Sequence, residues 1–252
     1  MIVLPAMGAR QEAAWRALIS VSQVMPTGWC LVGGQMVYLH CWERGVNPLR
    51  PSNDADMVLD VRAHPRIVYQ FTAILGELGF VSEGAPDVGH RHRWVNGDAA
   101  IDVLIPRHVG THAALRRGTT GGTLPGAPGG QAAINRAEPV EVSLDGSAGV
   151  VPRPTLQGAI AVKAAAYTVR DGREDRHLED LGVLSTLIIP DDRIRDGLTN
   201  TEITRIMSAT QALLGKSGLL STVPGGREGI VRLRMLLGET RDAGGAVWTD
   251  TT

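Results

Sequence analysis

The segment from residue 29 to residue 61 most strongly limits what this chain can fold into. It runs through WCLV, two glycines, the helical pattern QMVYLHCWER and, after a turn, the apolar strand pattern ADMVLDV. A short buried strand, a glycine turn, a helix and another buried strand are typical of an α/β fold. Yet Asp54 and Asp56 lie in the second strand, and burying a carboxylate is costly unless it is paired, hydrogen-bonded or metal-bound. The segment therefore predicts a fold class and also a site.

The same mixture of helices and strands continues along the first half of the chain. Apolar periodicity predicts further helices and strands at residues 9–24, 65–80, 90–95 and 99–106. The helix at 65–80 would have Pro65 in its first turn. Residues 107–131 are rich in glycine and threonine, which predicts a long loop, and a short β segment follows at 139–154.

From residue 155 onward the sequence is mainly helical in character. Helical segments are predicted at residues 155–170, 173–188, 201–214 and 227–239. We therefore expect an α/β (α+β) fold: a small mixed-sheet domain over 1–150, followed by a mainly helical half over 151–240 that completes the active-site cleft. The remaining residues, 241–252, are expected to be a flexible tail.

Composition excludes several classes of protein. The formal net charge of −1 provides no global field toward nucleic acid or an anionic membrane, so a nucleic-acid partner would need a local patch. No apolar run has the length of a membrane span, and the N-terminus lacks the pattern of a signal peptide. Two cysteines, Cys30 and Cys41, are too few for a disulfide framework, and a buried pair of thiols is expected. These features favour a cytoplasmic protein.

The glycine pair is placed where a phosphate group could bind. The strand before it ends at Gly33-Gly34, where backbone can approach a ligand closely because no Cβ is present. The helix expected to begin at Gln35 directs its N-terminal N–H groups and partial positive charge at the same place. Strand, glycine turn and helix N-terminus are together the parts of a phosphate site.

Three carboxylates are expected to meet beside this turn. Asp54 and Asp56 are two residues apart, so they project from the same face of a strand. Asp102, within AAIDVLIP, adds a third carboxylate on a separate strand. Three converging carboxylates repel one another unless a cation holds them, and Mg²⁺ is the cation that oxygen ligands and substrate phosphates suit.

This order of elements resembles the polymerase-β-type nucleotidyltransferase superfamily, which has a GG or GS turn, a DxD or DxE strand and an acid on a later strand. The matching residues are Gly33, Gly34, Asp54, Asp56 and Asp102. The resemblance implies that the three aspartates bind Mg²⁺ or Mn²⁺ and that an NTP is the substrate. This chain has Gln35 where many members have serine, and the hydroxyl of Ser52 is a candidate replacement.

The segment VKAAAYTVRDGREDRHLEDLGVL is similar to the corresponding helices of AbiEii-type, or MenT-type, toxin nucleotidyltransferases. The residues that match that active site are Ser52, Asp54, Lys163 and Asp180, and Asp175 competes with Asp180 because His177 stands where relatives have an acid. The resemblance covers about residues 28–188, and the last sixty residues are not placed by it.

Lys163 and Arg50 are the expected cationic contacts of the nucleotide. Lys163 is one of only two lysines among 25 basic residues and lies in an alanine-rich helical segment, where a point charge suits triphosphate oxygens. Together with the glycine pair and Ser52, these two residues form the predicted nucleotide-binding set. A surface lysine at the helix edge is the alternative interpretation of Lys163.

The toxin resemblance implies transfer of NMP from an NTP to an acceptor, most plausibly the 3′ end of tRNA, by a toxin with a cognate antitoxin. Residues 103–137 contain no acid and could provide the local positive surface that RNA requires. The arginines of this stretch are Arg107, Arg116, Arg117 and Arg136.

Two other hypotheses remain open. The segment LRPSNDADMVLDV is also similar to small antibiotic nucleotidyltransferases acting on aminoglycosides or lincosamides, for which an acidic cleft is expected. A non-catalytic nucleotide-binding module is the third possibility. Of the remaining aromatic and histidine residues, Trp94 is expected to pack in the core, and His90 and His92 to mark a polar strand edge.

Overall fold

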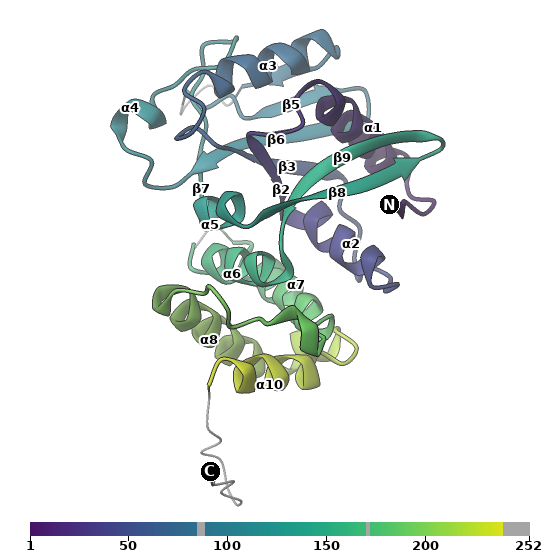
Figure 1. The fold of residues 1–252 in the computed structure, drawn as a ribbon, viewed down its shortest axis with the longest axis vertical. Helices are drawn as coiled ribbons and strands as arrows, with labels where there is room; N and C mark the ends of the chain where they lie inside the picture. The colour runs from purple at the N-terminus through teal and green to yellow at the C-terminus, as the bar shows by residue number, and fades with distance from the viewer. Residues whose placement is uncertain (85–88, 170–171, 239–252) are drawn as a thin grey trace, which may run out of the picture.

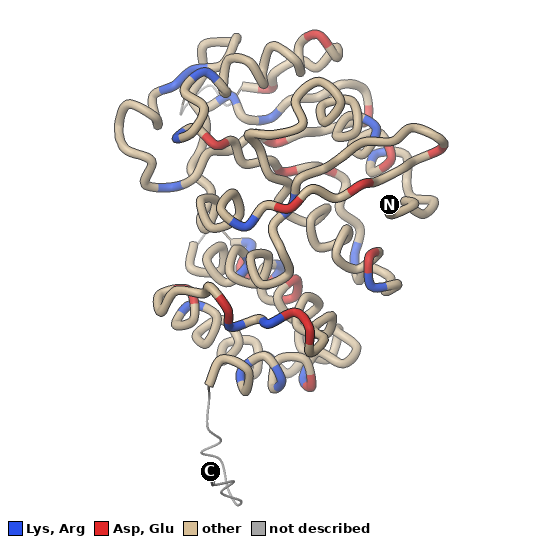
Figure 2. The backbone as a smooth tube through the Cα atoms, viewed as in Figure 1, with Lys and Arg blue, Asp and Glu red and all other residues tan. Residues whose placement is uncertain are grey.

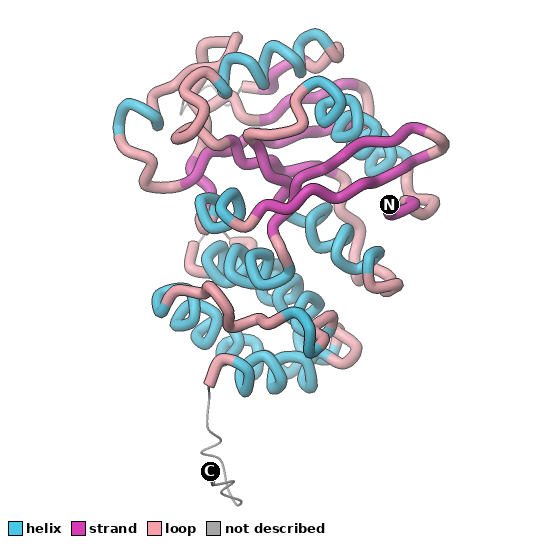
Figure 3. The backbone as a smooth tube through the Cα atoms, viewed as in Figure 1, coloured by secondary structure: helices cyan, strands magenta, loops and turns pink. Residues whose placement is uncertain are grey.

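The protein's structure, a computed structural model, describes residues 1–84, 89–169 and 172–238. Two β-sheets and the helices α1 to α5 occupy one end of the molecule, and the helices after residue 155 occupy the other (Figure 1). The α/β character predicted from the sequence is confirmed (Figure 3). The predicted tail, 241–252, lies outside the described residues.

The larger sheet carries the carboxylates. Within the described part of the chain it has six strands, in the order β2 (Trp29–Val32), β3 (Asp54–Leu59), β6 (Ala99–Pro106), β5 (Arg93–Asn96) and β4 (Val81–Glu83), with β7 (Gly126–Ala127) pairing with β6. β3 and β6 are parallel, whereas β2–β3, β6–β5 and β5–β4 are antiparallel. The sheet is therefore mixed, as expected.

A second sheet covers the first helix. It consists of β1 (Ile2–Val3), β8 (Ala137–Leu144) and β9 (Ser147–Pro154), in the order β1-β8-β9. The predicted β segment is thus a long hairpin, and its partner β1 lies at the N-terminus. Helix α1 (Ala9–Val24) packs against β9 and also against β6 and β3, so it joins the two sheets.

The structure corrects three boundaries in the first half of the chain. α2 (Gly33–Glu43) begins at the glycines themselves and not at Gln35. α3 (Ile67–Glu77) begins two residues after Pro65, which therefore precedes the helix. The predicted long loop at 107–131 contains α4 (Thr111–Ala114), β7 and the start of α5 (Gly130–Asn135). Short elements held by tertiary contacts have too few residues to show periodicity.

The second half consists of α6 (Leu156–Tyr167), α7 (Glu174–Thr186), η1 (Pro190–Asp192), α8 (Asn200–Leu214), α9 (Ser217–Ser221) and α10 (Gly226–Leu236). α6 begins where the Thr155 hydroxyl accepts from the Gly158 N–H at 3.4 Å. α8 begins with a capping box formed by Thr199 and Glu202. Such caps satisfy N–H groups that the first turn of a helix leaves unpaired.

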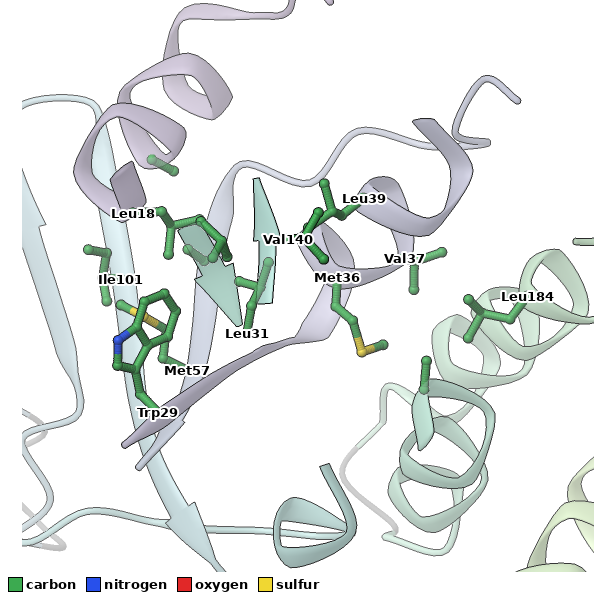
Figure 4. Packing of buried hydrophobic residues seen from close by; sticks show 14 of the residues in the cluster. Leu18, Trp29, Leu31, Met36, Val37, Leu39, Met57, Ile101, Val140 and Leu184 are labelled. Carbon is green, nitrogen blue, oxygen red and sulfur yellow. The ribbon is translucent and has the colours of Figure 1, made fainter. Parts of the chain in front are cut away.

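One hydrophobic core runs through both halves. Its members extend from Leu4 to Leu237 and include the sheet and the helices after residue 155. Figure 4 follows it from Met57 and Leu31 of the sheet through Met36 of α2 to Leu184 of α7. Apolar burial is the main favourable term in folding, so this shared core joins α6 and α7 to α2, which itself packs on β2 and β3. The division at residue 150 remains a prediction.

Candidate active site

The two glycines are needed because aspartate and serine side chains lie directly against them. Gly33 has φ +68°, and a Cβ there would lie 1.8 Å from the Asp56 carboxylate oxygen Oδ2. A Cβ on Gly34 would lie 2.3 Å from the Ser52 hydroxyl. Both conformation and space therefore require glycine at this turn, where β2 ends and α2 begins. The close neighbours of the two glycines are the side chains of Asp56 and Ser52, and the approach of a ligand to this turn remains a prediction.

The strand register brings the three aspartates to one face of the sheet. On β3, Asp56 lies opposite Val32 of β2 on one side and opposite Asp102 of β6 on the other. Asp54 is two residues earlier and therefore projects to the same face. The predicted carboxylate row is thus assembled from two parallel neighbouring strands.

The surroundings of this row disfavour negative charge. Burial, followed by the neighbouring charges of Asp54 and Asp102, raises the pKa of Asp56 to about 7, against the opposing effect of Lys163. Burial also raises the pKa of Asp102, although the Arg93 guanidinium acts in the opposite direction. Like charges on a partly buried surface stabilise the protonated acid, so the row attracts cations at neutral pH.

Arg93 provides a compensating charge beside Asp102 and Asp54, and it was not among the site residues predicted from the sequence. Its Nη1 donates to Asp102 Oδ2 at 3.0 Å and lies 3.7 Å from Asp54 Oδ2. The signal was available, because Gly97 and Asp98 form a two-residue connection between β5 and β6 that places Arg93 opposite Asp102. Charge-complementary cross-strand pairs are a common consequence of such a register.

The donor chemistry of the row suits a divalent metal. Its oxygens come from three carboxylates, and Asp102 Oδ1 is buried and has no hydrogen-bond partner among the described residues. Hard cations such as Mg²⁺ bind this donor type. Across residues 1–84, 89–169 and 172–238, however, no three His, Cys, Asp or Glu side chains are arranged as a metal site. Metal binding by Asp54, Asp56 and Asp102 therefore remains a prediction, which rests on the chemistry of their oxygens.

Gln35 supports the turn from the interior. Its Nε2 donates to the Ser52 carbonyl at 2.6 Å, and its Oε1 accepts from the Trp15 indole N–H at 2.8 Å. The side chain is fully buried. Gln35 therefore faces away from a ligand and fixes the loop that leads into Asp54.

Lys163 and Asp180 form a buried pair in the helical half. Lys163 Nζ on α6 donates to Asp180 Oδ2 on α7 at 2.6 Å, and both side chains are buried. Arg50 Nη2 donates to the other oxygen, Asp180 Oδ1, at 2.8 Å, and Arg50 Nε lies 3.0 Å from Glu179. Both oxygens of Asp180 are therefore paired with cations. Asp175, the competing candidate, is exposed and pairs with Lys216.

Two cavities border the carboxylate row. The smaller, of about 270 Å³, is lined by Gly33, Asp56 and Lys163, with Arg107 and Arg173 also on its wall. The larger, of about 720 Å³, is lined by residues on the other side of the row. The charged or polar residues that line the larger cavity are Arg10, Arg50, Ser52, Asn53, Asp54, Glu83, Arg93, Asp98 and Arg176. Of the predicted site residues, Arg50, Ser52 and Asp54 line the larger cavity and Gly33, Asp56 and Lys163 the smaller one, whereas Gly34, Asp102 and Asp180 line neither.

The arginines of residues 103–137 are engaged within the protein. Arg136 pairs with Glu202 at 2.9 Å and also donates to the Gly197 carbonyl. The others donate to backbone carbonyls: Arg107 to Gly126, Arg116 to Val61 and Arg117 to Gly121. Basic residues are distributed over both halves of the molecule in Figure 2. A role for this stretch in RNA binding remains a proposal.

The remaining expectations concern single residues. Trp94 is 2% exposed and packs in the core, as predicted. Cys30 and Cys41 are buried free thiols, and burial raises the pKa of Cys41 to about 12. The His90 ring bonds to the Thr123 hydroxyl at 3.0 Å. Among the described helices, none is long and apolar enough to cross a membrane.

Comparison with known proteins identifies the fold. No family model and no curated protein matches the sequence. The chain is similar to the crystal structure of an antigenic nucleotidyltransferase-like protein from Paracoccidioides brasiliensis, with TM-score 0.51 and 14% identity over 86% of this chain and 93% of that chain. For the solution structure of the antibiotic-resistance factor ANT(2'')-Ia, the TM-score is 0.34 and the identity 12%, over 91% and 97% of the two chains, and no argument rests on it. The chain therefore has the fold of a nucleotidyltransferase-like protein.

Proposed function

We propose that the protein is a metal-dependent nucleotidyltransferase that moves an NMP from an NTP to an acceptor hydroxyl and releases pyrophosphate. The observation that carries this proposal is the register that puts Asp56 beside Asp102, on the face where Gly33 leaves room for the Asp56 carboxylate. A carboxylate row beside a helix N-terminus can hold both a metal and the phosphates of a nucleotide.

Asp54, Asp56 and Asp102 would hold the metal. When bound, it would supply charge neutralisation for the triphosphate and lower the pKa of the attacking hydroxyl. The row itself favours cations, because burial and mutual repulsion raise the pKa of Asp56 to about 7.

The other parts of the site position the nucleotide. The smaller cavity contains the N-terminus of α2 at Gly33 and the buried ammonium of Lys163, which are suited to triphosphate oxygens. Asp180 holds the Lys163 ammonium in place. Asp102 Oδ1, which is buried and has no hydrogen-bond partner in the part of the chain that the structure describes, is suited to accept the proton of the acceptor hydroxyl.

The bond changes balance as an in-line displacement. The acceptor oxygen forms a bond to the α-phosphorus of the NTP while the bond to the bridging oxygen breaks, and pyrophosphate leaves. The hydroxyl proton passes to a carboxylate of the row. The rate enhancement would come from orientation and electrostatic stabilisation more than from covalent chemistry.

For the acceptor, we propose the 3′ end of tRNA, with the protein acting as the toxin of a toxin–antitoxin pair. A second candidate function is modification of a cationic antibiotic, and the carboxylates Glu83 and Asp98 on the larger cavity favour it. The two differ in the charge of the acceptor, which makes them separable by experiment.

The test is incubation of the protein with Mg²⁺, total bacterial tRNA and each α-³²P-labelled NTP in turn. We expect label on tRNA from at least one NTP, and a loss of about 10³-fold or more in Asp54→Asn, because one carboxylate of the row becomes neutral. Label on an added aminoglycoside or lincosamide instead would support the second candidate. Absence of transfer to RNA and to both drugs would overturn the proposal.

A further inference from the structure

The larger cavity can be assigned to one of the two substrates, and this inference rests on the proposed function. We infer that the acceptor enters this cavity beside Asp54 and that its phosphodiester backbone is held by Arg10 and Arg176. The acceptor is then an RNA chain, and its recognition does not depend on the arginine stretch at residues 103–137. Three observations lead to this inference.

The first observation is the position of the cavity. The features suited to a triphosphate, Gly33 and Lys163, line the smaller cavity together with Asp56. The larger cavity is lined by Asp54 and lacks both of these features. In an in-line displacement, the attacking and leaving oxygens lie on opposite sides of the phosphorus. The larger cavity is therefore the space left for the acceptor.

The second observation is its charge. Four arginines and three acids line the larger cavity. Arg50 is already paired with Asp180 and Glu179, and Arg93 with Asp102. The two remaining arginines are thus the ones that a ligand would meet with least competition from carboxylates.

The third observation is the surroundings of these two arginines. Arg10 Nε lies 3.8 Å from Asp98, and the two side chains are 70% and 63% exposed, so the pair is weak. Arg176 is exposed and makes no ion pair with any described residue. The two residues belong to α1 and α7, on different walls of the cavity. Guanidinium groups bind phosphate oxygens in a bidentate manner, so two of them can hold successive phosphates of a chain.

The acids of this cavity favour a cationic acceptor less strongly than Arg10 and Arg176 favour an anionic one. Glu83 lies 3.8 Å from Arg93, and Asp98 is the partner of Arg10. A cationic drug would therefore compete with arginines for both carboxylates. A phosphodiester chain would instead meet two guanidinium groups that are weakly paired or without a carboxylate partner.

The test measures RNA affinity separately from catalysis. Bulk tRNA labelled with ³²P at its 5′ end is titrated with protein by filter retention, without NTP, at several salt concentrations. For Arg10→Gln/Arg176→Gln we expect the Kd to rise about tenfold and the dependence of log Kd on log salt to fall by about 1.5, which corresponds to two lost phosphate contacts. Both side chains are at the surface, so this variant should fold normally.

A matched control removes the same charge elsewhere. Arg205→Gln/Arg227→Gln changes two exposed arginines on α8 and α10, at the opposite end of the molecule from the larger sheet (Figure 1). We expect this variant to change the tRNA Kd by less than about twofold. Equal losses in both double variants, or no loss in the cavity variant, would overturn the inference.

Two further measurements separate this inference from the proposed function. The Kd of each α-³²P-labelled NTP, measured by equilibrium dialysis, should be the same in wild type and in Arg10→Gln/Arg176→Gln. If wild type transfers nucleotide but the cavity variant keeps its RNA affinity, the inference alone fails. If Glu83→Gln/Asp98→Asn loses affinity for an added aminoglycoside and binds tRNA as wild type does, the acceptor is cationic. Wild type that binds RNA but no NTP would overturn the proposed function.

Discussion

Two charged clusters meet in the candidate site, and their surroundings are opposite in character. On the sheet, Asp56 and Asp102 lie side by side, and burial and repulsion raise the pKa of both. The buried oxygen Asp102 Oδ1 has no hydrogen-bond partner among residues 1–84, 89–169 and 172–238. Between α6 and α7, both oxygens of Asp180 accept from cations, Lys163 and Arg50. Arg93 offsets the negative charge of the first cluster only in part, whereas the second cluster is internally balanced.

The comparison shows which cluster is built for a ligand. A buried carboxylate is stable when it is paired, as Asp180 is, and costly when it is not. The β9 residue Arg153 resembles the balanced case: it is 1% exposed and pairs with Glu43 and Glu138. The unbalanced row of β3 and β6 is therefore the part that gains most from a bound cation, and the balanced cluster positions groups around it.

Breaking the balanced cluster should have the largest effect on stability. Lys163→Met leaves Asp180 buried with only Arg50 as partner, and removal of one member of a buried pair typically costs about 3–5 kcal/mol of the free energy of unfolding. The chain offers a matched control, since Lys216→Met breaks the exposed pair with Asp175. Urea unfolding should show a large loss for Lys163→Met and almost none for Lys216→Met. Equal stabilities would mean that the Asp180 cluster is not balanced by Lys163.

The glycine turn should be the next most sensitive point. Gly33→Ala places a Cβ 1.8 Å from the Asp56 carboxylate at φ +68°, whereas Gly45→Ala adds a Cβ at φ +66° with no atom within 4 Å. In both variants, alanine at positive φ should lower the free energy of unfolding by about 1 kcal/mol. In Gly33→Ala the clash with Asp56 should lower it by a further ~1–3 kcal/mol. Urea unfolding of the two variants measures the difference in stability. Equilibrium dialysis measures NTP binding by the same two variants. If both variants lose the same stability, Asp56 does not lie against the turn.

The unbalanced row should make stability depend on pH. The pKa of Asp56 is raised in the folded protein to about 7, so the stability it contributes is full below its unfolded pKa near 4 and is lost as pH rises through 7. Asp56→Asn removes this loss, and its Tm should exceed that of wild type by about 5 °C at pH 8, with a difference that shrinks toward pH 4.

The control for this measurement is Asp196→Asn, which changes an exposed aspartate in the helical half. Thermal unfolding of the three proteins between pH 4 and pH 8, in EDTA, provides the comparison. A difference between Asp56→Asn and wild type that does not vary with pH would contradict the assignment of the titration to Asp56.

The smallest effect concerns Arg93, a cation that already lies beside the row. Arg93 donates to Asp102 and lies near Asp54, so it opposes a metal ion electrostatically. Arg93→Gln should tighten Mn²⁺ binding about tenfold, as measured from the EPR signal of free Mn²⁺. Arg91→Gln removes the same charge two residues earlier, where no carboxylate is paired with it in the described structure, and should leave the Mn²⁺ Kd unchanged. Weaker Mn²⁺ binding in Arg93→Gln would show that Arg93 supports the metal ligands.

Much of the fold could be predicted because long segments have clear apolar periodicity. α1 spans Ala9–Val24, as the sequence predicted, and β6 spans Ala99–Pro106. The starts of α2 and α3 were misplaced by two residues, and the elements that were missed altogether are short ones such as β4 and α4, which have too few residues to establish a period. Local pattern is therefore a good guide only where the element is long.

The site was predictable in part for the same reason. Alternation along one strand puts Asp54 and Asp56 on one face, which needs no knowledge of the neighbours. The choice between Asp175 and Asp180 could not be made in this way, because both lie on α7 and only the packing against α6 brings Asp180 to Lys163. Arg93 was missed because its partner depends on the pairing of two strands.

By itself, the sequence determined the order of the longer strands and helices, the glycine turn and the presence of carboxylates on β3, because these depend on residues close together in the chain. Only the tertiary structure decided that Asp102 lies beside Asp56, that Arg50 and Lys163 share Asp180, and that two cavities border the row. The physical reason is that charge and burial act through space: a carboxylate's pKa and partners depend on what packing brings near it, whatever the separation along the chain.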